Sequence, residues 1–274
     1  MFTSRSKAIL EATNKMKAYE DSNTSTSSAE PNASKPIVCF EYAGHKCFSL
    51  SSPPERCPNT GKRLKSIKDF DIAPFRLPSP FAPAPDFPCS VVIRPTRGDF
   101  LEDYAPGDNL HIGVTASDGR IAEFDARGLR VRSDARRGRW RRSVVLNFKS
   151  TREFDPRLVL DPDWDEYWDS VLQAELDSGK WAAERYEERE RNCFTFVLEF
   201  LAALRTAPFS RMGAMDKVTF CEAFVLPKTT VASKYIRLHR RLVAEADDSE
   251  GGEGVISVKV ERGSEKSSAS LESL

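Results

Sequence analysis

The spacing of hydrophobic residues in the middle of the chain changes from a period of two to a period of three or four. Four short runs before residue 150 are β-branched or alternate between apolar and polar residues, which predicts strands. These runs are 90–95, 110–115, 120–124 and 143–148. The tetrapeptide Ala-Ser-Asp-Gly at 116–119 separates the second run from the third and predicts a tight hairpin turn.

Helical spacing dominates the chain after residue 160. Asp161 and Pro162 are typical of an N-cap and a first-turn proline, and the helix that they begin is expected to end near Gly179. Its apolar face consists of Trp164, Trp168, Val171 and Leu172. Residues 193–204 are apolar almost all round, which predicts a central, buried helix. We expect two further helices, separated by Pro227, at 216–224 and 230–244. Strands followed by helices predict an α+β fold, with a small antiparallel sheet packed on a bundle of about four helices.

Composition divides the chain into five segments. Residues 1–36 end in a stretch rich in Ser, Thr, Asn and Pro and are expected to be disordered. Residues 37–73 contain two β-prone runs around a glycine, which predict a small hairpin. Residues 74–88 contain six prolines and are expected to be an extended linker without a helix or a paired strand. The main domain is expected at 89–244, followed by a disordered, solvated acidic tail at 245–274.

The charge balance limits the partners that the whole chain would attract. The chain has 41 basic and 41 acidic residues and a formal net charge of zero, which gives no general attraction to nucleic acids or anionic membranes. No stretch approaches the ~18 apolar residues of a membrane span, and the first residues lack the apolar core of a secretory signal. The six scattered cysteines therefore indicate reduced thiols and a cytoplasmic or nuclear protein.

Two residues have the sequence context of a thiol-dependent active site. Asn192 is a good N-cap, so Cys193 is expected in the first turn of the buried helix, where the helix dipole favours a thiolate. His111 lies in a predicted strand, two residues before Gly113, which would allow another backbone or a ligand to approach closely. A cysteine at a helix start facing a histidine on a sheet is the arrangement of thiol hydrolases and acyltransferases. The alternative is a core cysteine and an unrelated strand histidine.

A third polar residue should orient the imidazole. Closure of the hairpin at 117–119 places Glu123 on the strand beside His111, and Asp125 is the second choice. Both carboxylates are alternatively explained as surface residues of the hairpin. The chemistry of such a site requires no metal and no organic cofactor.

The other two histidines give weaker signals. His45 lies at the tip of the predicted hairpin at 37–50, and thiolates together with an imidazole would suit zinc. The nearby cysteines are Cys39, Cys47 and Cys57. No Cys-x-x-Cys pair is present, because Cys57-Pro58 is followed by Asn59-Thr60, and we therefore expect no zinc. His239 is expected to be a solvated residue on the basic face of a helix.

Residues 127–142 form an arginine-rich run, with eight arginines, one acidic residue and Trp140. Such a run can bind nucleic acid or an acidic partner. The favoured interpretation is a solvated loop between two strands, whose charge is offset by the acidic residues of 161–166 and of the tail. We expect no specific nucleic-acid binding.

Several motifs, in the right order, resemble the makorin-2 opposite-strand protein family. The motifs are Ile93-Arg94-Pro95-Thr96, Leu-His-Ile-Gly-Val-Thr at 110–115, Trp181-Ala182 with Arg185-Tyr186-Glu187, Asn192-Cys193, Val-Leu-Pro-Lys-Thr at 225–229, and Ala-Ser-Lys-Tyr-Ile at 232–236. The resemblance covers residues 87–242, more than half of the chain, and by itself implies no activity. Members of the family tend to carry a Cys-Pro-x-Cys pair ahead of this domain, of which only Cys57-Pro58 remains here.

More distantly, His-x-Gly on a strand followed much later by Asn-Cys at a helix start resembles the circularly permuted papain-like fold of lecithin–retinol acyltransferases and PPPDE-type peptidases. This resemblance implies Cys193 as nucleophile, His111 as general base and then acid, and Glu123 as the orienting residue, although a glutamate is unusual there. Backbone amides at the helix start would form the oxyanion hole, and the substrate would be a peptide, isopeptide, ester or thioester. The alternative is a catalytically inactive interaction module on the same fold, which would bind protein through the former cleft or the arginine-rich run.

Overall fold

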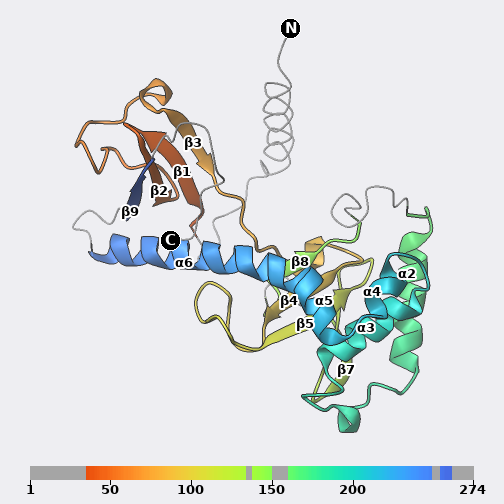
Figure 1. The fold of residues 1–274 in the computed structure, drawn as a ribbon. Helices are drawn as coiled ribbons and strands as arrows, with labels where there is room; N and C mark the ends of the chain where they lie inside the picture. The colour runs from red at the N-terminus through yellow and green to blue at the C-terminus, as the bar shows by residue number, and fades with distance from the viewer. Residues whose placement is uncertain (1–34, 134–137, 150–159, 249–253, 261–274) are drawn as a thin grey trace. The chain divides into compact units, whose positions relative to one another are not determined.

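The larger of two antiparallel sheets has five strands in the order β7-β6-β5-β4-β8 (Figure 1). The computed structural model describes residues 35–133, 138–149, 160–248 and 254–260. The strands are β4 (Val91–Pro95), β5 (Leu110–Thr115), β6 (Ile121–Asp125), β7 (Gly128–Arg132) and β8 (Val144–Leu146). Four of them lie where the sequence predicts strands. The sequence analysis missed β7, because its alternating Leu129 and Val131 lie among the arginines of the run at 127–142.

Helices pack against this sheet and enclose the main hydrophobic core. The described helices are α2 (Trp164–Asp177), α3 (Cys193–Ala203), α4 (Phe209–Gly213), α5 (Lys217–Phe220) and α6 (Leu226–Asp248). α3 packs against β5 and β6, with α2 and α4 on its other sides. The rings of Trp168 on α2 and Phe200 on α3 meet edge to face at 4.7 Å, and both are buried. The α+β class, the antiparallel sheet, the helical half and the central position of α3 are therefore confirmed.

The chain does not break at Pro227, contrary to the prediction of two separate helices. α5 passes into a π-helical turn at Cys221–Val225, which continues directly into α6. A proline cannot donate an amide hydrogen, and its ring crowds the carbonyl four residues earlier. The wider π turn immediately before Pro227 accommodates the ring, and the helical path continues.

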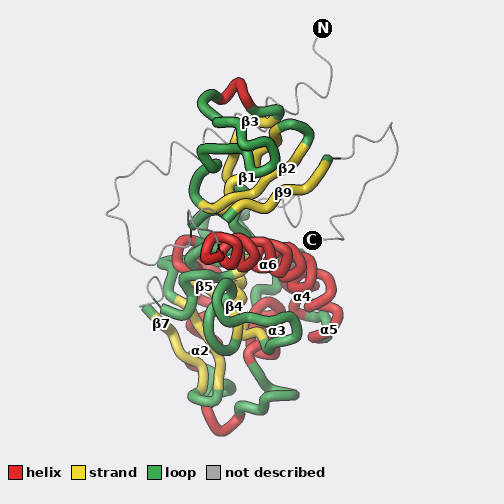
Figure 2. The backbone as a smooth tube through the Cα atoms, turned by 90° about the vertical axis from the view of Figure 1, so that its left-hand side faces the viewer, coloured by secondary structure: helices red, strands yellow, loops and turns green. Residues whose placement is uncertain are grey.

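A second, four-stranded sheet has the order β3-β1-β2-β9. Its strands are β1 (Ile37–Tyr42), β2 (His45–Leu50), β3 (Ile72–Arg76) and β9 (Val255–Lys259). The predicted hairpin is thus confirmed as β1 and β2. β9, however, corrects the prediction of a wholly solvated tail at 245–274, because Ile256 is buried against Ile37 and Leu242. α6 lies beside β2 and β9 of this sheet (Figure 2). It also contacts β8 of the larger sheet.

The proline-rich segment 74–88 also differs from its prediction. Pro74 lies within β3, a strand at the edge of the smaller sheet, where the pairing with β1 is irregular. Prolines are tolerated at such edges and bulges because no ladder hydrogen bond is lost there. Farther along, Ala82 exchanges two backbone hydrogen bonds with Ser143, at 3.0 and 2.9 Å. The segment is therefore not an extended linker without a helix or a paired strand: it pairs in β3 and at Ala82, and a short 3₁₀ helix spans Ala84–Asp86.

Two predictions about the chain ends fall outside the described residues. The first is the predicted disorder of segment 1–36, of which residues 1–34 lie outside the described part. The second is the predicted disorder of the acidic tail at 261–274. As to membrane insertion, none of the helices within the described part of the chain combines the length and the apolar character that a crossing needs.

Candidate active site

Cys193 is the first residue of α3, and its position is fixed by a capping box. Asn192 Oδ1 accepts hydrogen bonds from the amides of Phe194 at 3.0 Å and Thr195 at 3.4 Å. In return, Thr195 Oγ1 accepts from the Asn192 amide at 3.3 Å. This reciprocal pairing satisfies the donors that a helix start otherwise leaves open. The cap therefore holds the thiol at the positive end of the helix dipole, as the sequence predicts.

The structure brings the three predicted residues together. The Cys193 thiol lies close enough to His111 to raise the pKa of its imidazole. His111 Nε2 lies 3.1 Å from Glu123 Oε2. The exposed fractions are 5% for Cys193, 5% for His111 and 1% for Glu123. The thiol, the imidazole and the carboxylate thus lie together inside the protein, and the imidazole and the carboxylate are within hydrogen-bonding distance.

The register of β5 and β6 explains how Glu123 reaches the histidine. Glu123 pairs directly with Gly113, and side chains alternate between faces, so that His111 and Glu123 share one face of the sheet. A Cβ atom on Gly113 would lie 2.7 Å from the Ala122 carbonyl oxygen. The close approach that the sequence predicts at Gly113 is therefore an approach of the neighbouring strand.

Asp125, the second choice for orienting the imidazole, has another partner. Arg130 Nη2 donates to Asp125 Oδ2 at 2.6 Å. Between the two predicted carboxylates, it is Glu123 that contacts His111. Glu123 is therefore the carboxylate that lies where it can orient the imidazole.

Three arginines that the sequence analysis did not assign to the site also surround Glu123. Arg94 Nη2 lies 3.3 Å from Oε2, while Arg132 Nη1 and Arg130 Nη2 lie 3.3 and 3.7 Å from Oε1. Burial, the largest single effect, raises the pKa of Glu123. The hydrogen bond and charge of His111 and the charges of Arg94 and Arg132 outweigh it and lower the pKa from 4.5 to about 2. Glu123 is therefore held as a carboxylate.

The protonation of His111 is set by two opposing effects. Burial lowers the pKa of its imidazole, but the interactions with Cys193 and Glu123 outweigh burial, and the pKa is raised above 6.5. The surroundings thus favour an imidazolium beside the thiol. A histidine cation beside a cysteine is the arrangement by which thiol-dependent enzymes stabilise an ionised sulfur.

Arg94 and Trp140 complete the buried surroundings of His111. The Arg94 guanidinium lies over the Trp140 ring, 4.8 Å from its centroid, and the His111 and Trp140 ring centroids are 5.8 Å apart. Arg94 pairs directly with His111 across β4 and β5. One signal could have identified it: Arg94 is the single charged residue in an otherwise apolar, buried strand, and such a charge requires a buried partner.

The helix start offers fewer oxyanion donors than the sequence analysis expected. The amides of Phe194 and Thr195 already donate to Asn192 Oδ1. The backbone amide of Cys193 is the remaining candidate in the first turn of α3.

The arginine-rich run at 127–142 is not the solvated loop that we expected. β7 occupies its first part, and Trp140 is buried. Arg142 Nη1 donates to Asp99 at 2.6 Å and to Glu102 at 3.1 Å. The charge of the run is thus partly balanced by Glu123, Asp125, Asp99 and Glu102, whereas the acidic stretch at 161–166 was predicted to offset it.

The other histidines also have structural partners. His45 Nδ1 lies 3.1 Å from the carbonyl oxygen of Ala43. His239 is half-buried and stacks on Tyr235, which corrects its prediction as a solvated residue. Within the described ranges of the chain, no three His, Cys, Asp or Glu side chains gather in a way that could hold a metal ion.

Comparison with known proteins identifies the family. The model of the DUF4796 C-terminal family matches residues 74–242. The human MKRN2 opposite strand protein is 30% identical over 210 residues, which cover 77% of this chain and 87% of the human protein. The chain belongs to the MKRN2 opposite strand protein family. In this family member, the matched region contains Cys193, His111 and Glu123. No solved structure matches the chain, so the permuted papain-like fold remains a prediction.

Proposed function

We propose that this protein is a cysteine hydrolase or acyltransferase whose nucleophile is Cys193. The observation that supports the proposal most directly is the place of His111 between two partners: its Nε2 lies 3.1 Å from Glu123 Oε2, and the neighbouring Cys193 thiol raises the pKa of its imidazole. Cys193 itself lies at a capped helix start, where partial positive charge favours a thiolate. In this proposal the substrate is a peptide, isopeptide, ester or thioester.

Each member of the triad has a defined role in the proposed reaction. The Cys193 thiolate attacks the acyl carbon, and a tetrahedral intermediate forms with its oxyanion near the Cys193 amide. His111 gives its proton to the leaving amine, alcohol or thiol as the bond to the acyl carbon breaks. Water or an acceptor then attacks the acyl-enzyme, loses its proton to His111 and releases the thiolate.

Glu123 is proposed to orient His111 and to remain ionised throughout. Its pKa of about 2 means that it does not take the proton from the imidazolium near neutral pH. The role is that of the carboxylate in a serine-protease triad, which holds the ring in place and stabilises its positive charge. Because Arg94, Arg130 and Arg132 lie within 3.7 Å of Glu123, the carboxylate itself is fixed in position.

The test of this proposal is formation of an acyl-enzyme. The purified full chain is mixed with p-nitrophenyl acetate, the release of p-nitrophenol is followed, and the acetylated site is located by mass spectrometry. We expect a burst of product and acetylation at Cys193, both lost in Cys193→Ser and strongly reduced in His111→Asn. Cys221→Ser, which changes a half-buried cysteine on the π turn, is the matched control and should keep the burst.

A second candidate function is a catalytically inactive interaction module. It is favoured by the burial of the triad, since Cys193 and His111 are each only 5% exposed. In that case acetylation would be spread over several residues, would not depend on His111, and would show no burst. This result would contradict the enzyme and support the module.

A further inference from the structure

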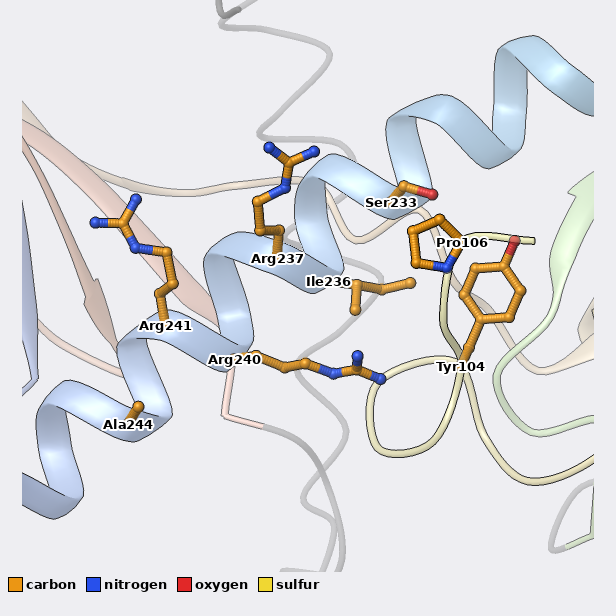
Figure 3. A pocket seen from close by; sticks show the side chains of 8 residues that line it. All are labelled: Tyr104, Pro106, Ser233, Ile236, Arg237, Arg240, Arg241 and Ala244. Atoms are coloured by element: carbon orange, nitrogen blue, oxygen red, sulfur yellow. The ribbon is translucent and has the colours of Figure 1, made fainter. Parts of the chain in front are cut away.

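A pocket lies between α6 and the segment that follows β4, away from any residue of the proposed triad. Its volume is about 360 Å³, which is the size of a small-molecule site. The residues that line it are Tyr104, Pro106, Ser233, Ile236, Arg237, Arg240, Arg241 and Ala244 (Figure 3). One wall is therefore apolar, formed by an aromatic ring, a proline and two aliphatic side chains.

Three arginines give this pocket its chemical character. Arg237, Arg240 and Arg241 are spaced three and four residues from the first, so that they occupy one side of α6 on adjacent turns. None of the eight lining residues is acidic. Arg241 is exposed and forms no ion pair within the described part of the chain. The pocket thus combines an apolar wall with a concentrated positive charge.

A backbone carbonyl holds the Arg240 guanidinium in place. Its Nε donates to the carbonyl oxygen of Leu101 at 2.7 Å, and this bond directs the guanidinium from α6 toward the segment that carries Tyr104 (Figure 3). Its Nη2 is buried and has no hydrogen-bond partner among the described residues. The charge of this fixed guanidinium thus forms part of the lining of the pocket.

We propose that the pocket binds a phosphate monoester with an apolar body. Guanidinium groups match the geometry of phosphate oxygens and bind them through paired hydrogen bonds. A group with close to two negative charges suits a pocket lined by three arginines and by no acidic residue better than a single carboxylate does. The ring of Tyr104 and the side chains of Pro106 and Ile236 would cover the apolar part of the ligand. The Ser233 hydroxyl is a further hydrogen-bonding group in the lining.

This site is independent of the proposed function, because it uses no residue of the triad. A phosphate monoester with an apolar body occurs in two settings, as a soluble compound and as a lipid headgroup. The two settings share the chemistry that the pocket recognises, and separate probes distinguish them.

Binding of 1-naphthyl phosphate to the full chain, followed by fluorescence, tests the proposal. We expect saturable binding that weakens with salt, that falls by about tenfold or more in Arg241→Gln and in Arg240→Met, and that is much weaker for 1-naphthol and for inorganic phosphate. Arg211→Gln, which changes an exposed arginine on α4, is the matched control and should bind normally. Binding to vesicles that contain phosphatidic acid, with phosphatidylcholine vesicles as control, tests whether the pocket recognises a lipid headgroup.

Arginine-dependent binding of 1-naphthyl phosphate or of phosphatidic acid vesicles supports the site. Which of the two probes binds shows whether the ligand is a soluble compound or a lipid headgroup. Binding to neither probe would overturn the proposal, and so would equal binding of 1-naphthol or unchanged affinity in Arg241→Gln. Arg240→Met also removes the bond to Leu101, so its thermal unfolding is measured first. Arg241→Gln keeps the test decisive if Arg240→Met does not fold, since Arg241 is exposed.

Discussion

His111 Nε2 and Glu123 Oε2 are 3.1 Å apart in a buried part of the larger sheet, where Arg94 also contacts the same carboxylate oxygen. One carboxylate thus balances a histidine and an arginine that are both nearly inaccessible to water. Removing a single partner from such a network leaves the others buried and unpaired, which is more costly than loss of the contact alone. The pair therefore affects both stability and the proposed chemistry.

Glu123→Gln should destabilise the protein and make its free energy of unfolding depend less on pH in the acid range. The pKa of Glu123 is lowered from 4.5 to about 2, so its contribution to the free energy of unfolding is present above pH 4.5 and is lost as the pH falls toward 2. At pH 7 we expect a loss on the order of 3 kcal/mol. The measurement is urea unfolding between pH 3 and pH 7. Asp118→Asn, at an exposed turn ion pair with Arg120, is the control and should cost little. A Glu123→Gln protein as stable as the wild type at pH 7 would contradict the description of this network.

Gly113→Ala should damage the site through the backbone. The added Cβ would lie 2.7 Å from the Ala122 carbonyl oxygen and 3.4 Å from Trp140, so β5 and β6 must separate. We expect a cost of about 1–3 kcal/mol, typical of overpacking, and a loss of Cys193 reactivity, because β5 carries His111. Gly44→Ala is the control: its φ is +73° and no atom lies near the new Cβ, so it should cost about 1 kcal/mol without changing Cys193. Unchanged reactivity in Gly113→Ala would show that the register does not position the triad.

Much of this site could be predicted from the sequence because it depends on local signals. Asn192 is an N-cap, the turn at 116–119 closes a hairpin, and alternation then places Glu123 near His111. These features act over short distances along the chain. The arginines around Glu123 could not be assigned in the same way, because they come from β4 and β7, and the position of β7 beside β6 depends on tertiary pairing.

The errors in the fold have a similar origin. β9 is a short run of residues in an acidic, glycine-containing tail. It forms a strand by pairing with the edge of β2, which is far away in the sequence. Pro74 is compatible with β3 because that strand lies at a sheet edge with irregular pairing. Pro227 does not interrupt the helical path because the preceding residues form a π turn. For β9 and Pro74 tertiary context overrides a local rule, whereas for Pro227 the local π geometry does so.

Ile256→Ala should show that β9 contributes to stability, contrary to the prediction that residues 245–274 are a disordered, solvated tail. Ile256 is 6% exposed and packs with Ile37 and Leu242. We expect a loss of about 2–4 kcal/mol, as for other buried aliphatic residues changed to alanine. Val258→Ala lies on the same strand, is 39% exposed, and should change stability by less than about 0.5 kcal/mol. Thermal or urea unfolding of both variants tests this, and equal effects would mean that β9 is not packed as described.

The relative reactivity of the six thiols tests the electrostatics of the site without assuming a substrate. Burial, followed by the charge of Asp165, raises the pKa of Cys89 to about 12, and burial, followed by Cys57, raises the pKa of Cys47 to about 11. Burial also raises the pKa values of Cys39 and Cys221. These four thiols should therefore stay protonated and react slowly with iodoacetamide in the folded protein, even at pH 8.

Cys193 differs from these thiols because it adjoins a histidine whose pKa is raised and lies at a capped helix start. We expect Cys193 to be alkylated first at pH 6, as read by mass spectrometry of each modified peptide. His111→Ala should slow that reaction by about tenfold or more, since the thiolate loses its cationic partner. His45→Ala, at the half-buried start of β2, is the matched control and should leave the rate unchanged. Denatured protein should lose the selectivity, because the order of reaction depends on burial and on His111. Preferential reaction of Cys89 or Cys47, or the same Cys193 rate with and without His111, would show that the ion pair does not form.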